Sequence, residues 1–141
     1  MADDLSPERQ LILLRHGKAE RGAGKDDFDR VLTPRGESEA VLMGEWLRDN
    51  ALVPDCVLSS PADRAAATAA LTCDASGVGA GIIQYDRRIY LASVEVLLAV
   101  LAAAPAESRR PMIVGHNPGL EMLLLSLVGP RQLAEQGGGQ M

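Results

Sequence analysis

Short apolar runs alternate with amphipathic stretches along most of the chain. The four runs are Leu11–Leu14, Cys56–Ser59, Ile82–Tyr85 and Met112–Val114. Continuous apolar runs of this length are typical of strands that are buried on both faces of a sheet. Between them, apolar residues recur at the spacing of a helix, as Ala40, Met43 and Leu47 do. This alternation predicts a three-layer α/β/α sandwich with a mostly parallel central sheet.

Capping residues mark where the helices begin and end. Thr33 and Pro34 suit the N-cap and the first position of a helix that ends near Asn50. The pattern S-x-x-D in Ser60–Asp63 is that of a capping box, and it predicts the start of a second helix. The same signals predict two more helices, one from Ser93 to just before Pro105 and one from Asn117-Pro118 to just before Gly129-Pro130.

Two segments between these elements are predicted to be loops. Gly17–Asp29 is polar and contains three glycines, so we expect it to lie on the surface over the sheet edge. Asp74–Gly81 consists mainly of small residues. Within the helices, we expect Leu42 and Trp46 to broaden the apolar face of the first one, and Leu127 to point inward from the last.

The composition limits the class of protein. The chain has 141 residues, of which 47% are hydrophobic, and its formal net charge is −5. A chain of this length supports one domain with a real core, so residues 1–141 are expected to be a single domain. The acidic balance argues against a broad basic face for nucleic acid, but it is compatible with a local basic pocket.

The sequence carries no signal for a membrane or for secretion. Val94–Ala104 is among its most apolar stretches and is too short to span a bilayer. Residues 1–9 form a polar segment that lacks the basic and apolar parts of a secretory signal. Cys56 and Cys73 show neither metal-ligand spacing nor a disulfide framework. We therefore expect a cytoplasmic protein that binds no membrane and no nucleic acid.

The two histidines of the chain both lie at the ends of predicted strands. His16 and His116 each follow an apolar run, Arg15 precedes His16, and Arg64 falls in the first turn of the second predicted helix. In open α/β sheets, ligands bind at the carboxyl ends of the strands. These four side chains are therefore predicted to form one pocket at that edge.

Such a pocket suits a phosphoryl group. A neutral imidazole at His16 can attack phosphorus and form a phosphohistidine, and nearby cations keep that imidazole neutral by lowering its pKa. Arg15 and Arg64 can donate paired hydrogen bonds to phosphoryl oxygens, and His116 can donate one from the opposite side. Gly17 permits a close approach of the backbone because it has no Cβ.

Other interpretations remain open for each residue taken alone. His16 and Arg15 could be polar residues at a strand end, Arg64 could pair with Asp63 or another carboxylate, and His116 could bond to loop backbone. A metal site is disfavoured, because the chain has neither an H-x-x-x-H nor a C-x-x-C pattern. No P-loop and no G-x-S-x-G elbow occur.

Four motifs resemble the histidine phosphatase superfamily, also called phosphoglycerate mutase-like. They are RHG at Arg15–Gly17, LTPRG at Leu32–Gly36, SSPxxRAxxTA at Ser59–Ala69 and VGHNPG at Val114–Gly119. The small size and the form R-x-L-T-P-R-G are most similar to the SixA-like phosphohistidine phosphatases. The resemblance implies a phosphoglycerate mutase-like fold, His16 as the phosphorylated nucleophile, a phosphate pocket of Arg15, His16, Gly17, Arg64 and His116, and neither metal nor cofactor.

The chain departs from that family in two places. Many members carry a glutamate as proton donor after the third strand, whereas this chain has Leu91 there, with Asp86 and Glu95 nearby. Relatives usually continue into a final strand, whereas residues 131–141 form an irregular tail, so that strand is expected to be absent. An imidazole leaves phosphorus more easily than an alkoxide does, so the missing acid favours phosphoramidate or aryl phosphate substrates.

The leading hypothesis is therefore a metal-independent phosphatase that acts on phosphohistidine in a partner protein, such as a histidine-phosphorylated signalling protein. A phosphomonoesterase for a small phosphoester is the first alternative, and a phosphate-binding module without turnover is the second. A mutase is the least favoured, because the chain has few residues from which to build a lid. The sequence leaves the oligomeric state open.

Overall fold

Four parallel strands form the central sheet of the computed structural model, which describes residues 9–22 and 24–128. The strands are β1 (Ile12–Arg15), β2 (Cys56–Ser59), β3 (Ile83–Tyr85) and β4 (Pro111–Gly115), in the order β1-β4-β2-β3. Every pair is parallel, and Arg15 lies opposite Gly115 in the β1–β4 ladder. The predicted parallel sheet is confirmed.

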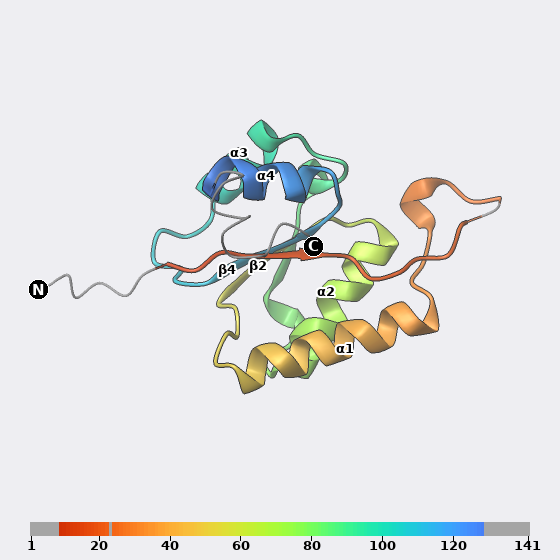
Figure 1. The fold of residues 1–141 in the computed structure, drawn as a ribbon, viewed down its shortest axis with the longest axis horizontal. Helices are drawn as coiled ribbons and strands as arrows, with labels where there is room; N and C mark the ends of the chain where they lie inside the picture. Colours follow the sequence, from red (N-terminus) through yellow and green to blue (C-terminus); the bar gives the residue numbers. More distant parts are fainter. Residues whose placement is uncertain (1–8, 23, 129–141) are drawn as a thin grey trace, which may run out of the picture.

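Two helices cover each face of this sheet (Figure 1). The helices are α1 (Pro34–Asp49), α2 (Asp63–Ser76), α3 (Val94–Ala102) and α4 (Gly119–Val128). The first two pack against one face and the last two against the other, which confirms the three-layer α/β/α architecture. Three 3₁₀ turns lie between these elements: η1 (Asp27–Asp29), η2 (Ala80–Ile82) and η3 (Arg87–Ile89).

A separate apolar core lies on each face. Strand residues alternate between the two cores, because successive side chains of a strand point to opposite sides. Ile113 of β4 packs with Leu120 and Leu123 of α4, whereas its neighbours Met112 and Val114 pack against α1 and α2. Both faces are thus buried in the central strands β2 and β4, which explains their apolar runs, whereas the edge strands β1 and β3 are only partly buried.

The boundaries of α2 differ from those predicted. The helix begins at Asp63 with Ala62 as N-cap, so Ser60 is not its cap. At the other end it continues to Ser76 and ends at Gly77, whose φ of 96° suits a residue without a Cβ. The predicted loop Asp74–Gly81 was therefore wrong for its first three positions, where small residues are compatible with a helix as well as with a loop.

Three apolar side chains predicted to point inward are exposed. Leu42 and Trp46 of α1 are 63% and 53% exposed, and Leu127 of α4 is 49% exposed. Helix α1 contacts α2 through Gly44, where a Cβ would meet the carbonyl oxygen of Thr72. Positions two residues away from that seam lie about 200° around the helix, and they face solvent.

No helix in the described ranges is long and apolar enough to cross a membrane.

Arg9, the last residue of the predicted polar segment, donates a hydrogen bond from Nε to the carbonyl oxygen of Ser108 at 2.9 Å. The rest of that segment, the Gly129-Pro130 stop and the predicted tail 131–141 lie outside the described residues.

Candidate active site

The sheet brings both histidines to the same edge. Strands β1 and β4 are neighbours, and the ladder extends one residue further, because the backbone N–H of His16 donates to the carbonyl oxygen of Gly115 at 3.1 Å. The two imidazole rings, of His16 and His116, consequently lie with centroids 5.1 Å apart. Arg64 joins them from the first turn of α2, which follows the adjacent strand β2.

His16 is held in the tautomer that a nucleophile needs. Its Nδ1 lies 2.7 Å from the carbonyl oxygen of Gly17, which can only accept, so we place the proton on Nδ1. The lone pair is then on Nε2, which accepts a hydrogen bond from Arg64 Nε at 3.3 Å. Burial lowers the pKa of His16 below its ordinary value, and the positive charges of Arg64 and Arg15 act in the same direction against the Gly17 hydrogen bond.

Arg64 is buried, and each of its three guanidinium nitrogens donates a hydrogen bond. Besides Nε, its Nη1 donates to the Asp27 carbonyl oxygen at 2.6 Å and its Nη2 to Asp27 Oδ2 at 2.8 Å. A guanidinium in the first turn opposes the helix dipole, so this carboxylate offsets an unfavourable charge. The ion pair considered from the sequence thus exists, but with a loop residue in place of Asp63.

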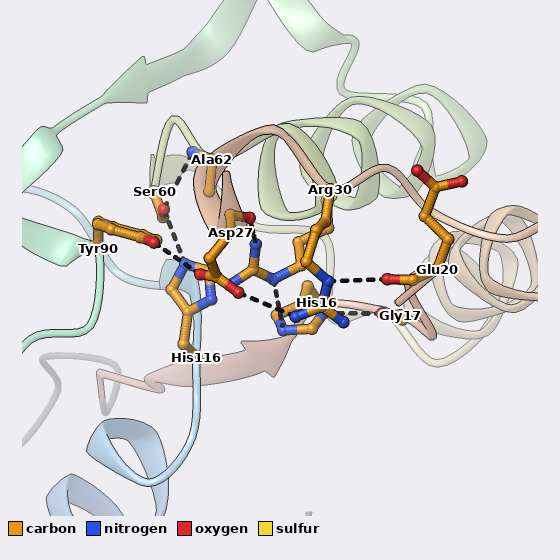
Figure 2. A network of polar contacts seen from close by, with 10 residues as sticks. His16, Gly17, Glu20, Asp27, Arg30, Ser60, Ala62, Tyr90 and His116 are labelled. Atoms are coloured by element: carbon orange, nitrogen blue, oxygen red, sulfur yellow. Dashed lines mark hydrogen bonds and ion pairs between the residues drawn. The ribbon is translucent and has the colours of Figure 1, made fainter. Parts of the chain in front are cut away.

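His116 has one partnered and one unpartnered nitrogen. Its Nε2 lies 2.8 Å from Ser60 Oγ, and that oxygen also accepts from the backbone N–H of Ala62 at 3.2 Å (Figure 2). Among the described residues, His116 Nε2 is the only acceptor found for the Ser60 hydroxyl proton, so we assign that proton to this contact, which leaves the His116 proton on Nδ1. Nδ1 is buried and has no hydrogen-bond partner among the described residues. Burial first, and then the charge of Arg64, lowers the pKa of His116 to about 4.

Arg15 and Gly17 contribute differently from the three central groups. Arg15 ends β1 with its side chain exposed, and it affects His16 through its charge. The N–H of Gly17 donates to Thr68 Oγ1 at 3.0 Å. A Cβ on Gly17 would lie 2.9 Å from the carbonyl oxygen of Gly36, so the missing side chain allows the loop to pack against the start of α1.

Two cavities open beside His16. One of about 510 Å³ is lined by strand and helix residues, including Leu14, Met43 and Thr68. The other, of about 400 Å³, is lined by basic side chains together with Glu39, and its cations are Arg15, Lys18 and Arg30. The surroundings of His16 are therefore accessible and positively charged on one side.

A group of loop residues at the pocket was not foreseen from the sequence. Asp27 receives hydrogen bonds from Arg30 Nη1 at 2.9 Å and from the Tyr90 hydroxyl at 2.6 Å. The ring of Tyr90 packs edge-on against His116, with centroids 5.4 Å apart, and against Phe28. One signal was available, since Phe28 and Tyr90 are two of only four aromatic residues in the chain and Phe28 stands in a polar segment.

The described part of the chain contains no cluster of three histidine, cysteine or acidic side chains that could hold a metal ion. Cys56 and Cys73 are buried and free.

The sequence profile of the histidine phosphatase superfamily (branch 1) matches residues 11–88. An uncharacterised protein from Mycobacterium leprae is 37% identical over 120 residues, which are 82% of this chain and 71% of that protein. A 2,3-bisphosphoglycerate-dependent phosphoglycerate mutase from a Nocardioides species is 46% identical over 70 residues, but these cover 47% of this chain and only 28% of the mutase.

A solved structure agrees over a longer span. The crystal structure of a candidate phosphohistidine phosphatase, SixA from Agrobacterium tumefaciens, superposes with a TM-score of 0.81 at 34% identity. The superposition covers 93% of this chain and 84% of that one. On this evidence, the chain belongs to the histidine phosphatase superfamily and to its SixA-like branch.

Proposed function

We propose that this protein is a metal-independent phosphatase that takes a phosphoryl group onto Nε2 of His16 and then releases it to water. The observation that carries the proposal is the fixed tautomer of His16, whose Nδ1 faces the Gly17 carbonyl oxygen at 2.7 Å and whose Nε2 faces the cation of Arg64. An imidazole held in this way has its lone pair where a phosphoryl group would be stabilised by charge.

The residues have distinct roles in the first step. A docking phosphoryl group takes over the hydrogen bonds of Arg64 and accepts another from His116 Nδ1, while Arg15 adds positive charge at the rim. His16 Nε2 then forms a bond to phosphorus as the bond to the leaving group breaks, and the leaving group keeps the electron pair. Arg64 thus exchanges its hydrogen bonds to His16 and Asp27 for bonds to the phosphoryl oxygens, on which charge develops.

The second step uses the same pocket. Water attacks the phosphorus of phospho-His16, the P–N bond breaks, and the electron pair returns to Nε2. The Gly17 carbonyl oxygen stays on Nδ1 throughout, so the ring leaves as neutral imidazole and is ready for another cycle. The low pKa of His16 favours that neutral state at physiological pH.

We further propose that the substrate is phosphohistidine in a partner protein. Leu91 stands where the family resemblance places an acid, and its side chain is exposed. Of the two acids near it in sequence, Asp86 is paired with Arg88, with Oδ2 and Nη2 2.7 Å apart, and Glu95 lies exposed on α3. A leaving group that needs no proton from the enzyme is therefore the best match, and a protonated imidazole is one. A cytoplasmic location stays a prediction.

Trapping the intermediate tests the nucleophile. The protein is incubated with phosphate-labelled phosphohistidine or aryl phosphate and quenched, and the bound label should be acid-labile and base-stable. His16→Ala should retain no label and should lose turnover of a chromogenic aryl phosphate by roughly 10³-fold or more. Undiminished turnover by this variant would contradict the assignment of His16.

A substrate panel tests the leaving group. Phosphohistidine, aryl phosphates, and sugar and nucleotide phosphates are compared by kcat/KM, with and without EDTA. We expect phosphohistidine to be preferred and EDTA to have no effect. Hydrolysis of sugar phosphates alone would support the small-molecule phosphomonoesterase instead, and phosphate protection against heat without any product would support a binding module.

A further inference from the structure

The carboxylate of Asp27, a loop residue, lies next to the buried guanidinium of Arg64 and contacts three donors. Asp27 Oδ2 is 2.8 Å from Arg64 Nη2 and 2.6 Å from the Tyr90 hydroxyl, and Oδ1 is 2.9 Å from Arg30 Nη1 (Figure 2). The side chain of Asp27 is 45% exposed, whereas that of Arg64 is 4% exposed. The carboxylate is thus on the solvent side of the guanidinium, within reach of a group bonded to a phosphoryl that Arg64 holds.

Two of these three donors are also held by contacts other than the one with Asp27. Arg30 is fixed by a second bond, from Nε to the carbonyl oxygen of Glu20 at 2.7 Å. Tyr90 is fixed by its ring, which packs between Phe28 and His116. When a phosphoryl group replaces Asp27 as the acceptor of Arg64 Nη2, Asp27 can therefore keep its hydrogen bonds from Arg30 and Tyr90. Its Oδ2 then has one lone pair free to accept another hydrogen bond.

The carboxylate of Asp27 is suited to accept hydrogen bonds and not to donate a proton. The hydrogen bonds from Tyr90, Arg30 and Arg64 hold the pKa of Asp27 far below its usual range. An acid that assists an alkoxide leaving group needs the opposite environment, one that raises its pKa. Asp27 therefore does not replace the missing acid at Leu91.

We propose that Asp27 is a specificity residue that selects a substrate with a protonated phosphohistidine ring, by accepting a hydrogen bond from the ring nitrogen that is not bonded to phosphorus. This inference rests on the proposed phosphatase function, since it assumes that a phosphoryl group occupies Arg64 and His116. The carboxylate favours the protonated form of the phosphohistidine ring. When His16 Nε2 bonds to phosphorus, the substrate P–N bond breaks, its electron pair stays on the ring nitrogen, and the other nitrogen keeps its proton. The leaving group is then a neutral imidazole.

The same carboxylate disfavours phosphate esters. A departing phenolate or alkoxide gains negative charge and carries no N–H toward Asp27. Two negative groups at close range repel each other, and solvent screens part of this repulsion because the Asp27 side chain is 45% exposed. One residue thus raises the rate for P–N substrates and lowers it for P–O substrates.

The test compares the kcat/KM values of the Asp27→Asn variant for a P–N substrate and a P–O substrate. Asp27→Asn keeps the shape but removes the charge, and kcat/KM is measured for a histidine-phosphorylated peptide and for 4-nitrophenyl phosphate. We expect the first to fall about tenfold and the second to rise about threefold, so that the ratio falls about thirtyfold. Asp29→Asn is the matched control, because Asp29 is an exposed acid in the same turn. Its ratio should equal that of the wild type.

Tyr90→Phe provides a second variant, since it removes one donor to Asp27 and keeps the ring. It should shift the ratio in the same direction as Asp27→Asn, but less. A ratio within twofold of the wild type for Asp27→Asn, including an equal loss on both substrates, would overturn the inference while leaving the phosphatase proposal intact. Failure of the phosphatase proposal looks different, because the wild type would then neither release phosphate nor carry label on His16.

Discussion

The groups at the pocket come from two regions with different construction. His16, Arg64 and His116 are attached to strand ends or to the first turn of a helix, and their positions follow from the sheet. Asp27 and Arg30 come from the segment between β1 and α1 and lie closer to solvent. Under the proposed function, the two regions have different tasks: the sheet edge binds the phosphoryl group, and the loop distinguishes one leaving group from another.

Removing a sheet-edge cation should have the largest effect. Arg64→Ala takes away the buried donor that faces both His16 and the phosphoryl group, so kcat/KM should fall by roughly 10³-fold on every substrate. Steady-state kinetics on phosphohistidine and an aryl phosphate measure it, with circular dichroism to confirm folding. Arg35→Ala is the control, since Arg35 is exposed on α1 and pairs with Glu39. A loss limited to one substrate would contradict the division of tasks.

The packing of the loop after β1 against the start of α1 can be disrupted separately. A Cβ at Gly36, in the first turn of α1, would collide with the backbone of Lys18. Gly36→Ala should therefore lower the free energy of unfolding by about 1–3 kcal/mol, measured by urea denaturation. Gly81→Ala, where a Cβ meets nothing within 4 Å, is the matched control. Equal stability of the two variants would show that the loop is not anchored here.

A smaller loss is expected when a sheet-edge group is left in place but loses its orienting partner. Ser60→Ala removes the hydroxyl 2.8 Å from His116 Nε2, so the ring is no longer held with Nδ1–H toward the pocket. We expect kcat to fall about tenfold, the equivalent of one hydrogen bond. Ser76→Ala, which removes a buried bond to the Cys73 carbonyl oxygen far along α2, should reduce stability without changing kcat. If both variants keep full activity, the assigned tautomer of His116 is wrong.

The smallest effect is a pH dependence of stability that belongs to the sheet edge. The folded-state pKa of His116 is about 4, below that of an unfolded histidine, so the unfolded state binds the proton first as pH falls. Stability should therefore decrease as pH is lowered from about 6.5 towards 4, with His16 contributing in the same direction. Urea denaturation across this range measures the slope, and His116→Gln should reduce it. An unchanged slope would place the pH dependence elsewhere.

The sequence predicted the sheet-edge region better than the loop. Buried parallel strands are short apolar runs, so their ends could be located, and polar residues at those ends pointed to His16, Arg64 and His116. The contacts of Asp27 could not be predicted, because Tyr90 is 63 residues away and they meet only through tertiary structure. Ser60 was interpreted as part of a helix-capping pattern, but its hydroxyl bonds to His116. The capping-box pattern in a sequence does not show which partner the side chain bonds to.

The inward faces of the helices were predicted only in part. Apolar residues around α1 do not all mark a buried face, and the seam with α2 is set by the small residue Gly44. Hydrophobic side chains on helices are common at protein surfaces, so the larger residues Leu42 and Trp46 were misleading.

The register of β1 against β4 has a consequence for how this site can change. Each histidine comes one residue after its strand, and Arg15 and Gly115 are partners in the ladder. The distance between His16 and His116 is therefore set by the spacing of neighbouring strands, about 4.8 Å, and not by the length of any connecting segment. Under the proposed function, insertions or deletions between β1 and α1 can therefore change the substrate preference without changing the distance between His16 and His116.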